Sequence, residues 1–224
     1  MALFPKTERT RLKRIPERGV YERDEVYRIL DEGLVAHVGF VVNGQPYVIP
    51  MAYGRRGDEL LIHGSSASRL LRSVGSGIQA CVTVTLLDGV VAARAVFHHS
   101  MNYRSAIVFG VASAIDERGR KLAALEAISD HILPGRWNEA RRPNAKELAA
   151  TLVLSLPLEE ASAKIRRGPP KDEEEDGDLP IWAGEIPLRL VPLDPVADPA
   201  LRPPVAISRS VRLFRESRDS KGIG

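Results

Sequence analysis

The stretch that decides the fold is FHHSMNYRSAIVFG, residues 97–110, in which a run of polar side chains is followed by an apolar run. In an extended chain side chains alternate between two faces, so every second residue from His98 to Arg104 would share one face. Residues 107–109 then predict a buried strand that ends at Gly110. Hydrogen-bonding groups on both faces fit either a solvated edge strand or a ligand site, and this stretch alone leaves both open.

A second polar stretch, HGSSASR at residues 63–69, follows the apolar residues 60–62 and begins a short helix. Free backbone N–H groups, several hydroxyls and a guanidinium at a helix start suit a phosphate. An ordinary serine N-cap is the alternative. Arg104 with Ser105 supplies a second arginine–serine pair, which favours the phosphate interpretation.

The spacing of apolar residues and turn residues predicts a mainly β chain. A helix is expected over 24–32, followed by a hairpin through Asn43-Gly44. The expected strands are 34–42, 47–53, 60–62, 78–87, 90–97 and 107–115, with Asp88-Gly89 as a turn. Short turns between so many strands favour a closed antiparallel barrel.

The second half of the chain adds helices around this barrel. One helix is predicted over 122–133, and another begins at Asn144, which forms a capping box with Glu147. Residues 151–156 are expected to return to the barrel as a strand, whereas 158–165 could be helical or extended. The acidic loop 171–178 is most simply solvated.

Length and composition favour one core. The chain has 224 residues, 44% of them hydrophobic, and a formal net charge of +3. We expect a domain over 15–191 between an N-terminal arm, 1–14, and a C-terminal arm, 192–224, that is partly disordered. Basic residues near the N-terminus lack interleaved aromatic residues, which is typical of a solvated tail rather than of a nucleic-acid surface.

Cysteine usage and hydropathy bound the environment of the protein. Cys81 is the single cysteine, so an intrachain disulfide and a thiolate metal cluster are excluded. No window approaches the roughly 20 apolar residues of a membrane span. The sequence therefore predicts a soluble, cytoplasmic protein with no membrane partner.

Several stretches together resemble a known family. In this order, VIPMAY, HGSSASR, CVTVTLLDG, FHHSMNYRSAIVFG and IWAGEIPLRL resemble the FMN-binding split-barrel family related to pyridoxamine 5'-phosphate oxidase, in the branch that includes nitroimidazole-resistance proteins. The resemblance covers most of residues 15–191. It implies a mainly β, six-stranded antiparallel split barrel with peripheral helices, and a homodimer with an FMN between the two subunits.

The resemblance also implies which residues hold FMN. The ring would lie along the backbone of residues 49–52, and the indole of Trp182, in Trp182-Ala183-Gly184, would approach it from the partner subunit. The implied FMN-binding residues are Ile49, Pro50, Met51, Ala52, His63, Gly64, Ser65, Ser68, Arg69, Arg104, Ser105 and Trp182. Arg69-Leu70 stands where the oxidase has Arg-Lys, and its full basic set for pyridoxal phosphate is missing, so oxidase activity itself is not expected.

The remaining motifs assign the chemistry to the cofactor. The sequence holds no G-x-S-x-G elbow and no P-loop, and adjacent His98 and His99 would diverge in a strand rather than form a metal cage. One of these histidines could protonate a reduced small-molecule substrate, or one could anchor a loop. We expect an FMN-dependent oxidoreductase. The alternatives are a non-catalytic flavin- or haem-binding protein, and a deazaflavin-dependent reductase that uses Lys164, Arg166 and Arg167.

Overall fold

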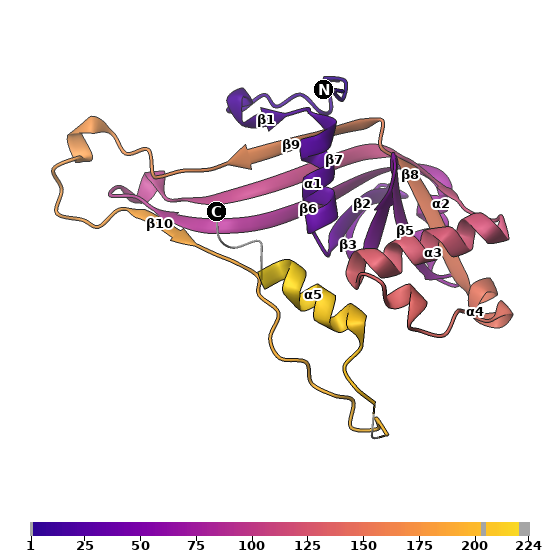
Figure 1. Cartoon of the computed structure of the whole chain (residues 1–224). Helices are drawn as coiled ribbons and strands as arrows, with labels where there is room; N and C mark the ends of the chain where they lie inside the picture. Colours follow the sequence, from indigo (N-terminus) through magenta and orange to yellow (C-terminus); the bar gives the residue numbers. More distant parts are fainter. Residues whose placement is uncertain (1, 203–204, 220–224) are drawn as a thin grey trace.

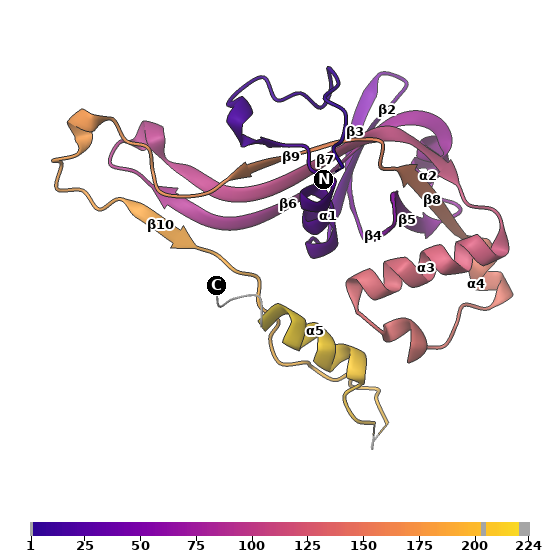
Figure 2. The same ribbon diagram turned by 45° about the horizontal axis from the view of Figure 1, so that its top comes forward.

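The chain is built on one long hairpin, formed by strands β6 (Ser76–Ala92) and β7 (Ser100–Ala114). The structure is a computed structural model that describes residues 2–202 and 205–219, without the side chains of Arg69, Leu70 and Asp219. In both views the hairpin projects well beyond the rest of the sheet (Figures 1 and 2). Every other strand pairs directly or through a neighbour with this hairpin.

The main path of the sheet runs in the order β3-β2-β6-β7-β8-β5-β4. Its strands besides the hairpin are β2 (Ala36–Val42), β3 (Gln45–Met51), β4 (Tyr53–Arg56), β5 (Glu59–Ser65) and β8 (Thr151–Pro157). The first and last strands of this path, β3 and β4, are separated in sequence only by Ala52. The sheet therefore curls until its two ends meet at this bend, which confirms a mainly β antiparallel split barrel.

Three further strands extend the sheet along the hairpin. Strand β9 (Glu160–Arg166) pairs with β7 and with the short β1 (Gly19–Val20), and β10 (Gly184–Pro187) pairs with β6. The described residues thus form a ten-stranded sheet rather than six strands. Strands β1 and β10 have two and four residues, whereas β9 has seven and pairs with the middle of β7, Tyr103–Phe109.

Helices cover the curled sheet on its concave side and at one end (Figure 1). The described helices are α1 (Arg23–Glu32), α2 (Arg69–Gly75), α3 (Arg118–Ile132), α4 (Ala145–Ala150) and α5 (Arg209–Asp219), with 3-10 turns at η1 (Pro16–Arg18), η2 (Val96–His98), η3 (Arg136–Asn138) and η4 (Glu174–Asp176). Helix α1 buries Val26, Ile29 and Leu30 in the main core. None of the described helices is long and apolar enough to cross a membrane.

Several sequence predictions are confirmed. Helix 24–32 is α1, and the Asn43-Gly44 turn has the positive φ angles, 50° and 77°, that favour these two residues. Asn144 and Glu147 form the predicted capping box of α4. Strand β8 returns to the sheet between β7 and β5, and the ambiguous segment 158–165 is extended, as β9.

The predicted turn at Asp88-Gly89 is wrong. Strand β6 continues through these residues to Ala92, with an irregular register between Leu87 and Gly89, and the chain reverses only at η2. A Cβ on Gly89 would lie 3.0 Å from the carbonyl oxygen of Ile186 in β10. The close approach of β6 and β10 requires a glycine at position 89. In the sequence, such a glycine cannot be distinguished from a turn glycine.

The terminal arms also differ from expectation. The N-terminal residues are not a solvated tail, because Phe4 is 2% exposed in the core and Arg9 pairs with Glu160 of β9. Residues 192–202 and 205–208 have no regular secondary structure, and α5 follows them. The disorder predicted for the C-terminal arm partly concerns 203–204 and 220–224, which lie outside the described residues.

Helix α3 packs directly on strand β4 at Gly54. A Cβ at Gly54 would lie 2.8 Å from Cα of Ile128 and 2.9 Å from the carbonyl oxygen of Ala127. Because these atoms belong to helix backbone, Gly54→Ala should lower the free energy of unfolding by about 1–3 kcal/mol. Urea unfolding followed by circular dichroism measures this loss.

The matched control is Gly39→Ala in β2, where the nearest atom to the new Cβ is the Cys81 carbonyl oxygen at 3.4 Å. This contact is ordinary, so the urea midpoint should change little. Equal midpoints for the two variants would contradict the close packing of α3 on β4.

Candidate functional site

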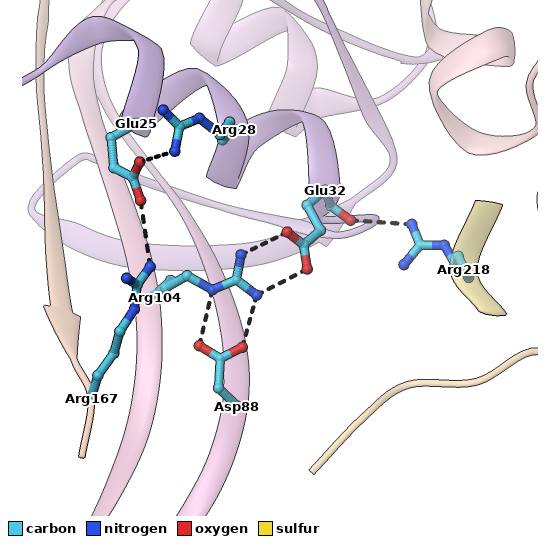
Figure 3. Close-up of polar contacts among 7 residues, drawn as sticks. All are labelled: Glu25, Arg28, Glu32, Asp88, Arg104, Arg167 and Arg218. Carbon is cyan, nitrogen blue, oxygen red and sulfur yellow. Dashed lines mark hydrogen bonds and ion pairs between the residues drawn. The ribbon is translucent and has the colours of Figure 1, made fainter. Parts of the chain in front are cut away.

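Arg104 lies between two carboxylates, at the point where the hairpin leaves the barrel (Figure 3). Its Nη1 and Nη2 donate to the Glu32 carboxylate at 2.6 and 2.9 Å, and its Nε and Nη2 donate to the Asp88 carboxylate at 2.9 and 2.8 Å. The hydrogen bonds to Glu32, and then those to Asp88, raise the pKa of Arg104. The guanidinium predicted to hold a phosphate is therefore already neutralised.

The same cluster ties α1 to its neighbours (Figure 3). Arg218 of α5 donates to the main-chain carbonyl oxygen of Glu32 at 3.1 Å. Arg167, just after β9, lies 3.6 Å from the carboxylate of Glu25, which also pairs with Arg28. Arg104 and Arg167 therefore pair with carboxylates of α1, and Arg218 binds a main-chain carbonyl oxygen at its end.

A small polar cavity of about 280 Å³ adjoins this cluster. It is lined by Asp88, Gly89, Asn102, Arg104, Arg167, Gly168, Glu185 and Pro187. The buried Asn102 donates to Glu185 and accepts from the guanidinium of Arg166, which also donates to the carbonyl oxygens of Gly168 and Pro169 at 2.9 and 3.1 Å. Burial lowers the pKa of Arg166, whose Nε has no partner.

The second predicted phosphate stretch forms the corner between β5 and α2. Ser68 caps α2 by accepting from the N–H of Leu71 at 3.4 Å, and Ser65 accepts from the N–H of Ala67 at 3.2 Å. The N-cap alternative is thus confirmed, while both hydroxyl hydrogens are still able to donate to a ligand. Arg69 is the first residue of α2, but its side chain is outside the described atoms.

Gly64 is the residue of this corner that admits no side chain. A Cβ there would lie 2.5 Å from Cδ1 of Leu71. The glycine lets α2 fold back on the end of β5.

His63 is the histidine of the corner, and its environment differs from that of most histidines in the chain. Its Nδ1 is buried without a hydrogen-bond partner, and burial lowers its pKa. His131 is also buried with a lowered pKa, but its Nε2 lies 2.7 Å from the carbonyl oxygen of Gly33. Burial therefore favours the neutral imidazole of His63, and none of the described residues forms a hydrogen bond with it.

The bend between β3 and β4 lies beside His63. Tyr53 pairs with Ile62, which places Ala52 next to His63, whereas residues 49–51 belong to β3 and pair with β2. Ile49 and Met51 are half-buried and Pro50 and Ala52 are exposed. Of the predicted ring-binding backbone, the strand pairing therefore brings Ala52 beside the His63–Ser68 corner.

Arg104 and Ser105 do not join this corner within one chain. Ser105 lies opposite Thr85, with 2.8 Å between their hydroxyl oxygens. Ser113, which pairs with Ser76 directly after α2, is nine residues along β7 from Arg104, or about 30 Å of strand. The two predicted halves of the phosphate site are therefore well separated in the single chain.

The remaining predicted residues lie toward the outer end of the hairpin. His98 belongs to η2 rather than to a strand, and its Nε2 lies 3.5 Å from Glu173. His99 Nε2 lies 3.2 Å from the carbonyl oxygen of Ala93. His99 thus anchors the turn and His98 faces the acidic loop, while a proton-donor role for either histidine stays a prediction. Trp182 is 66% exposed, and its ring covers Gly184.

Sequence reasoning missed the carboxylates that occupy Arg104. Glu32 was part of a predicted helix and Asp88 part of a predicted turn, and neither position carries a local signal of pairing with residue 104. Only the register of β6 against β7, with Leu86 opposite Arg104, brings Asp88 within reach. Asp88 lies two residues beyond Leu86, on the same side of β6, and is therefore a diagonal neighbour of Arg104. A prediction that continued the strand past Asp88 would have shown this proximity.

The chain is similar to known proteins in sequence and in structure. The family model described as pyridoxamine 5'-phosphate oxidase matches residues 22–165. No curated protein matches the chain. The flavocytochrome Anf3 from Azotobacter vinelandii is 41% identical, with a TM-score of 0.88 over 93% of this chain and 97% of that chain.

Two further solved structures are similar. An FAD- and haem-binding protein from Mycobacterium smegmatis is 40% identical, with a TM-score of 0.84 over 87% of this chain and 96% of that chain. A candidate 5-nitroimidazole antibiotic resistance protein from Bacteroides thetaiotaomicron is 21% identical, with a TM-score of 0.55 over 66% of this chain and 86% of that chain. The last similarity concerns the fold alone.

The Arg104 cluster predicts a specific stability pattern. Arg104→Gln removes the guanidinium that bonds the Glu32 and Asp88 carboxylates, which are 29% and 31% exposed, and leaves these two like charges close together. We expect the free energy of unfolding to fall by about 1–3 kcal/mol, less than for a fully buried pair because solvent screens the charges. Removing both carboxylates as well, in Arg104→Gln with Glu32→Gln and Asp88→Asn, should recover most of this loss. A triple variant no more stable than Arg104→Gln in chemical denaturation would contradict the electrostatic role.

Proposed function

Because this chain belongs to the pyridoxamine 5'-phosphate oxidase family, we propose that it is a flavin- and haem-binding electron-transfer protein. One observation carries the proposal. The chain is about 40% identical, over nearly its whole length, to two solved proteins, one a flavocytochrome and the other an FAD- and haem-binding protein. The family by itself would support only a flavin.

The corner formed by residues 49–52 and 63–68 fits a flavin. It offers main-chain groups at the bend after β3, and the Ser65 and Ser68 hydroxyls, which accept from backbone N–H groups and can donate outward. Our sequence prediction was FMN, but Arg104 and Ser105 lie too far away to complete its phosphate site in this chain. The similar M. smegmatis protein binds FAD, so we propose FAD as the flavin.

His63 fits the role of a haem ligand. A neutral imidazole is the form that coordinates iron, and burial keeps His63 neutral. His98, His99 and His131 each have a partner in the protein, whereas no hydrogen bond to the described residues engages His63. His37 is exposed on β2 and is the comparison residue.

The chemistry belongs to the bound groups, and the protein supplies their positions. A flavin provides hydride and one-electron chemistry, and a haem provides one-electron chemistry. The described residues around the corner hold hydroxyls and a neutral imidazole, which bind and orient. Arg166 is directed at backbone carbonyls, so it does not supply the free basic groove on which the deazaflavin alternative depended.

A second copy of the chain completes the proposal. Val41 and Val48 are 54% and 65% exposed on the same face of β2 and β3, an apolar area that one chain leaves uncovered. We propose a homodimer in which this face is covered and in which the partner's Trp182 approaches the flavin. His98 or His99 as proton donor to a small-molecule acceptor stays a prediction within that assembly.

The cofactor content of native protein tests the proposal. Protein purified without added cofactors should show flavin absorbance and a haem Soret band, and mass spectrometry of the released flavin should give FAD. Protein that neither carries nor takes up a flavin and a haem would refute the proposed function. Release of FMN instead would refute the choice of FAD and keep the flavin.

The role of His63 makes a separate prediction. His63→Ala should lose most of the haem while retaining the flavin, because none of the described residues forms a hydrogen bond with the His63 side chain that the substitution would break. The control, His37→Ala, should retain both cofactors. The readout is the Soret-to-flavin absorbance ratio. Unchanged haem content in His63→Ala would rule out His63 as the ligand.

A further inference from the structure

The tip of the long hairpin, residues 93–99, presents two apolar side chains to solvent. Val96 is 81% exposed and Phe97 is 90% exposed. The turn that carries them is held from inside by Asp172, whose carboxylate accepts from the N–H groups of Arg94 at 3.0 Å and Ala95 at 3.4 Å. An apolar pair displayed on a preorganised turn is typical of a contact surface.

The tip is bordered by negative charge. Residues 171–178 fold against it and contain six carboxylates and one lysine: Asp172, Glu173, Glu174, Glu175, Asp176 and Asp178, with Lys171. Glu174 and Glu175 are exposed, and together with Glu173 they line a hollow of about 450 Å³. This acidic border disfavours anionic membranes and nucleic acids, and it fits a partner surface that is both apolar and basic.

Helix α5 has these two properties. Arg209, Arg212, Arg215 and Arg218 recur every third residue, and Val211, Leu213 and Phe214 lie between them. These three apolar side chains are half-buried, and Arg209 and Arg212 are exposed, whereas Arg215 pairs with Asp194 and Arg218 donates to the carbonyl oxygen of Glu32. Polar contacts at the start of the helix, Ser210 to Glu139 and Arg136 to Ser208, also hold it to the body.

We propose that the hairpin tip of one protomer docks on helix α5 of a second copy of this chain. The tip and α5 lie well apart in both views, so the two surfaces do not meet within one chain (Figures 1 and 2). A two-fold axis would form the contact twice, tip to helix and helix to tip. The inference rests on the homodimer of the proposed function. It identifies Phe97, the carboxylates of the tip and the arginines of α5 as the determinants of the stability of the dimer.

Reciprocal charge reversal tests the contact. The tip variant is Glu174→Lys with Glu175→Lys, which leaves Asp172 and Glu173 in place. The helix variant is Arg209→Glu with Arg212→Glu, both exposed, and glutamate suits the first turn of a helix. By sedimentation equilibrium of native protein, each variant alone should dimerise at least about tenfold more weakly than wild type.

Mixing the two variants in equal amounts should restore dimers, because the heterodimer matches opposite charges at both contacts. Phe97→Ser should also weaken the dimer, and high salt should weaken the wild type. The control, Asp116→Lys with Glu159→Lys, reverses two exposed charges elsewhere and should leave dimerisation unchanged.

The outcomes separate this contact from the proposed function. The contact between tip and helix is overturned if neither variant weakens dimerisation, or if both variants lose it and mixing does not restore it. Either result would favour another partner for the tip. A monomeric wild type that still carries flavin and haem would overturn the contact and the dimer and leave cofactor binding intact. Wild-type protein that dimerises through this contact but neither carries nor takes up a flavin and a haem would instead count against the proposed function alone.

Discussion

The antiparallel ladder between β6 and β7 is the constraint on which the rest of the structure depends. It runs from Ser76 opposite Ser113 to Val91 opposite Ser100, far longer than a typical strand pair of about five or six residues. Each strand has a second partner over only part of its length: β6 pairs with β2 near the barrel and with β10 farther out, while β7 pairs with β8 and β9. A one-residue slip would turn every side chain to the other face and misalign all of these neighbours.

The register of this ladder also explains why Arg104 serves structure in the single chain. The irregular pairing between Leu87 and Gly89 places the Asp88 carboxylate on one side of the guanidinium, and the end of α1 places Glu32 on the other. The two carboxylates accept from Nε, Nη1 and Nη2 of the guanidinium. A phosphate would have to compete with both, so this position joins α1 to the hairpin rather than attracting an anion.

Local rules predicted much of the fold, and failed where a contact distant in sequence decides the outcome. Helix α1, the Asn43-Gly44 turn and the capping box at Asn144 follow from residues within a few positions of one another, and all three are confirmed. Asp88-Gly89 has the same local appearance as a turn, but β10, almost a hundred residues later, needs that glycine. The His63–Ser68 corner could be recognised from its residues, whereas the separation of Arg104 from it depends on strand length and register.

The chemistry of the corner limits what it can hold. Between His63 and Ser68 the sequence HGSSAS has no acid, lysine or arginine, and burial keeps His63 uncharged. Attraction between charges therefore contributes little from these six residues, and binding has to come from hydrogen bonds and from burial of apolar area at about 25 cal/mol per Å². Large flat ring systems bury far more area than small phosphate compounds do. A bend of exposed main chain beside a neutral imidazole thus suits a ring-shaped cofactor better than a small anionic substrate, which is why we place the cofactors, rather than a substrate phosphate, at this end of the barrel.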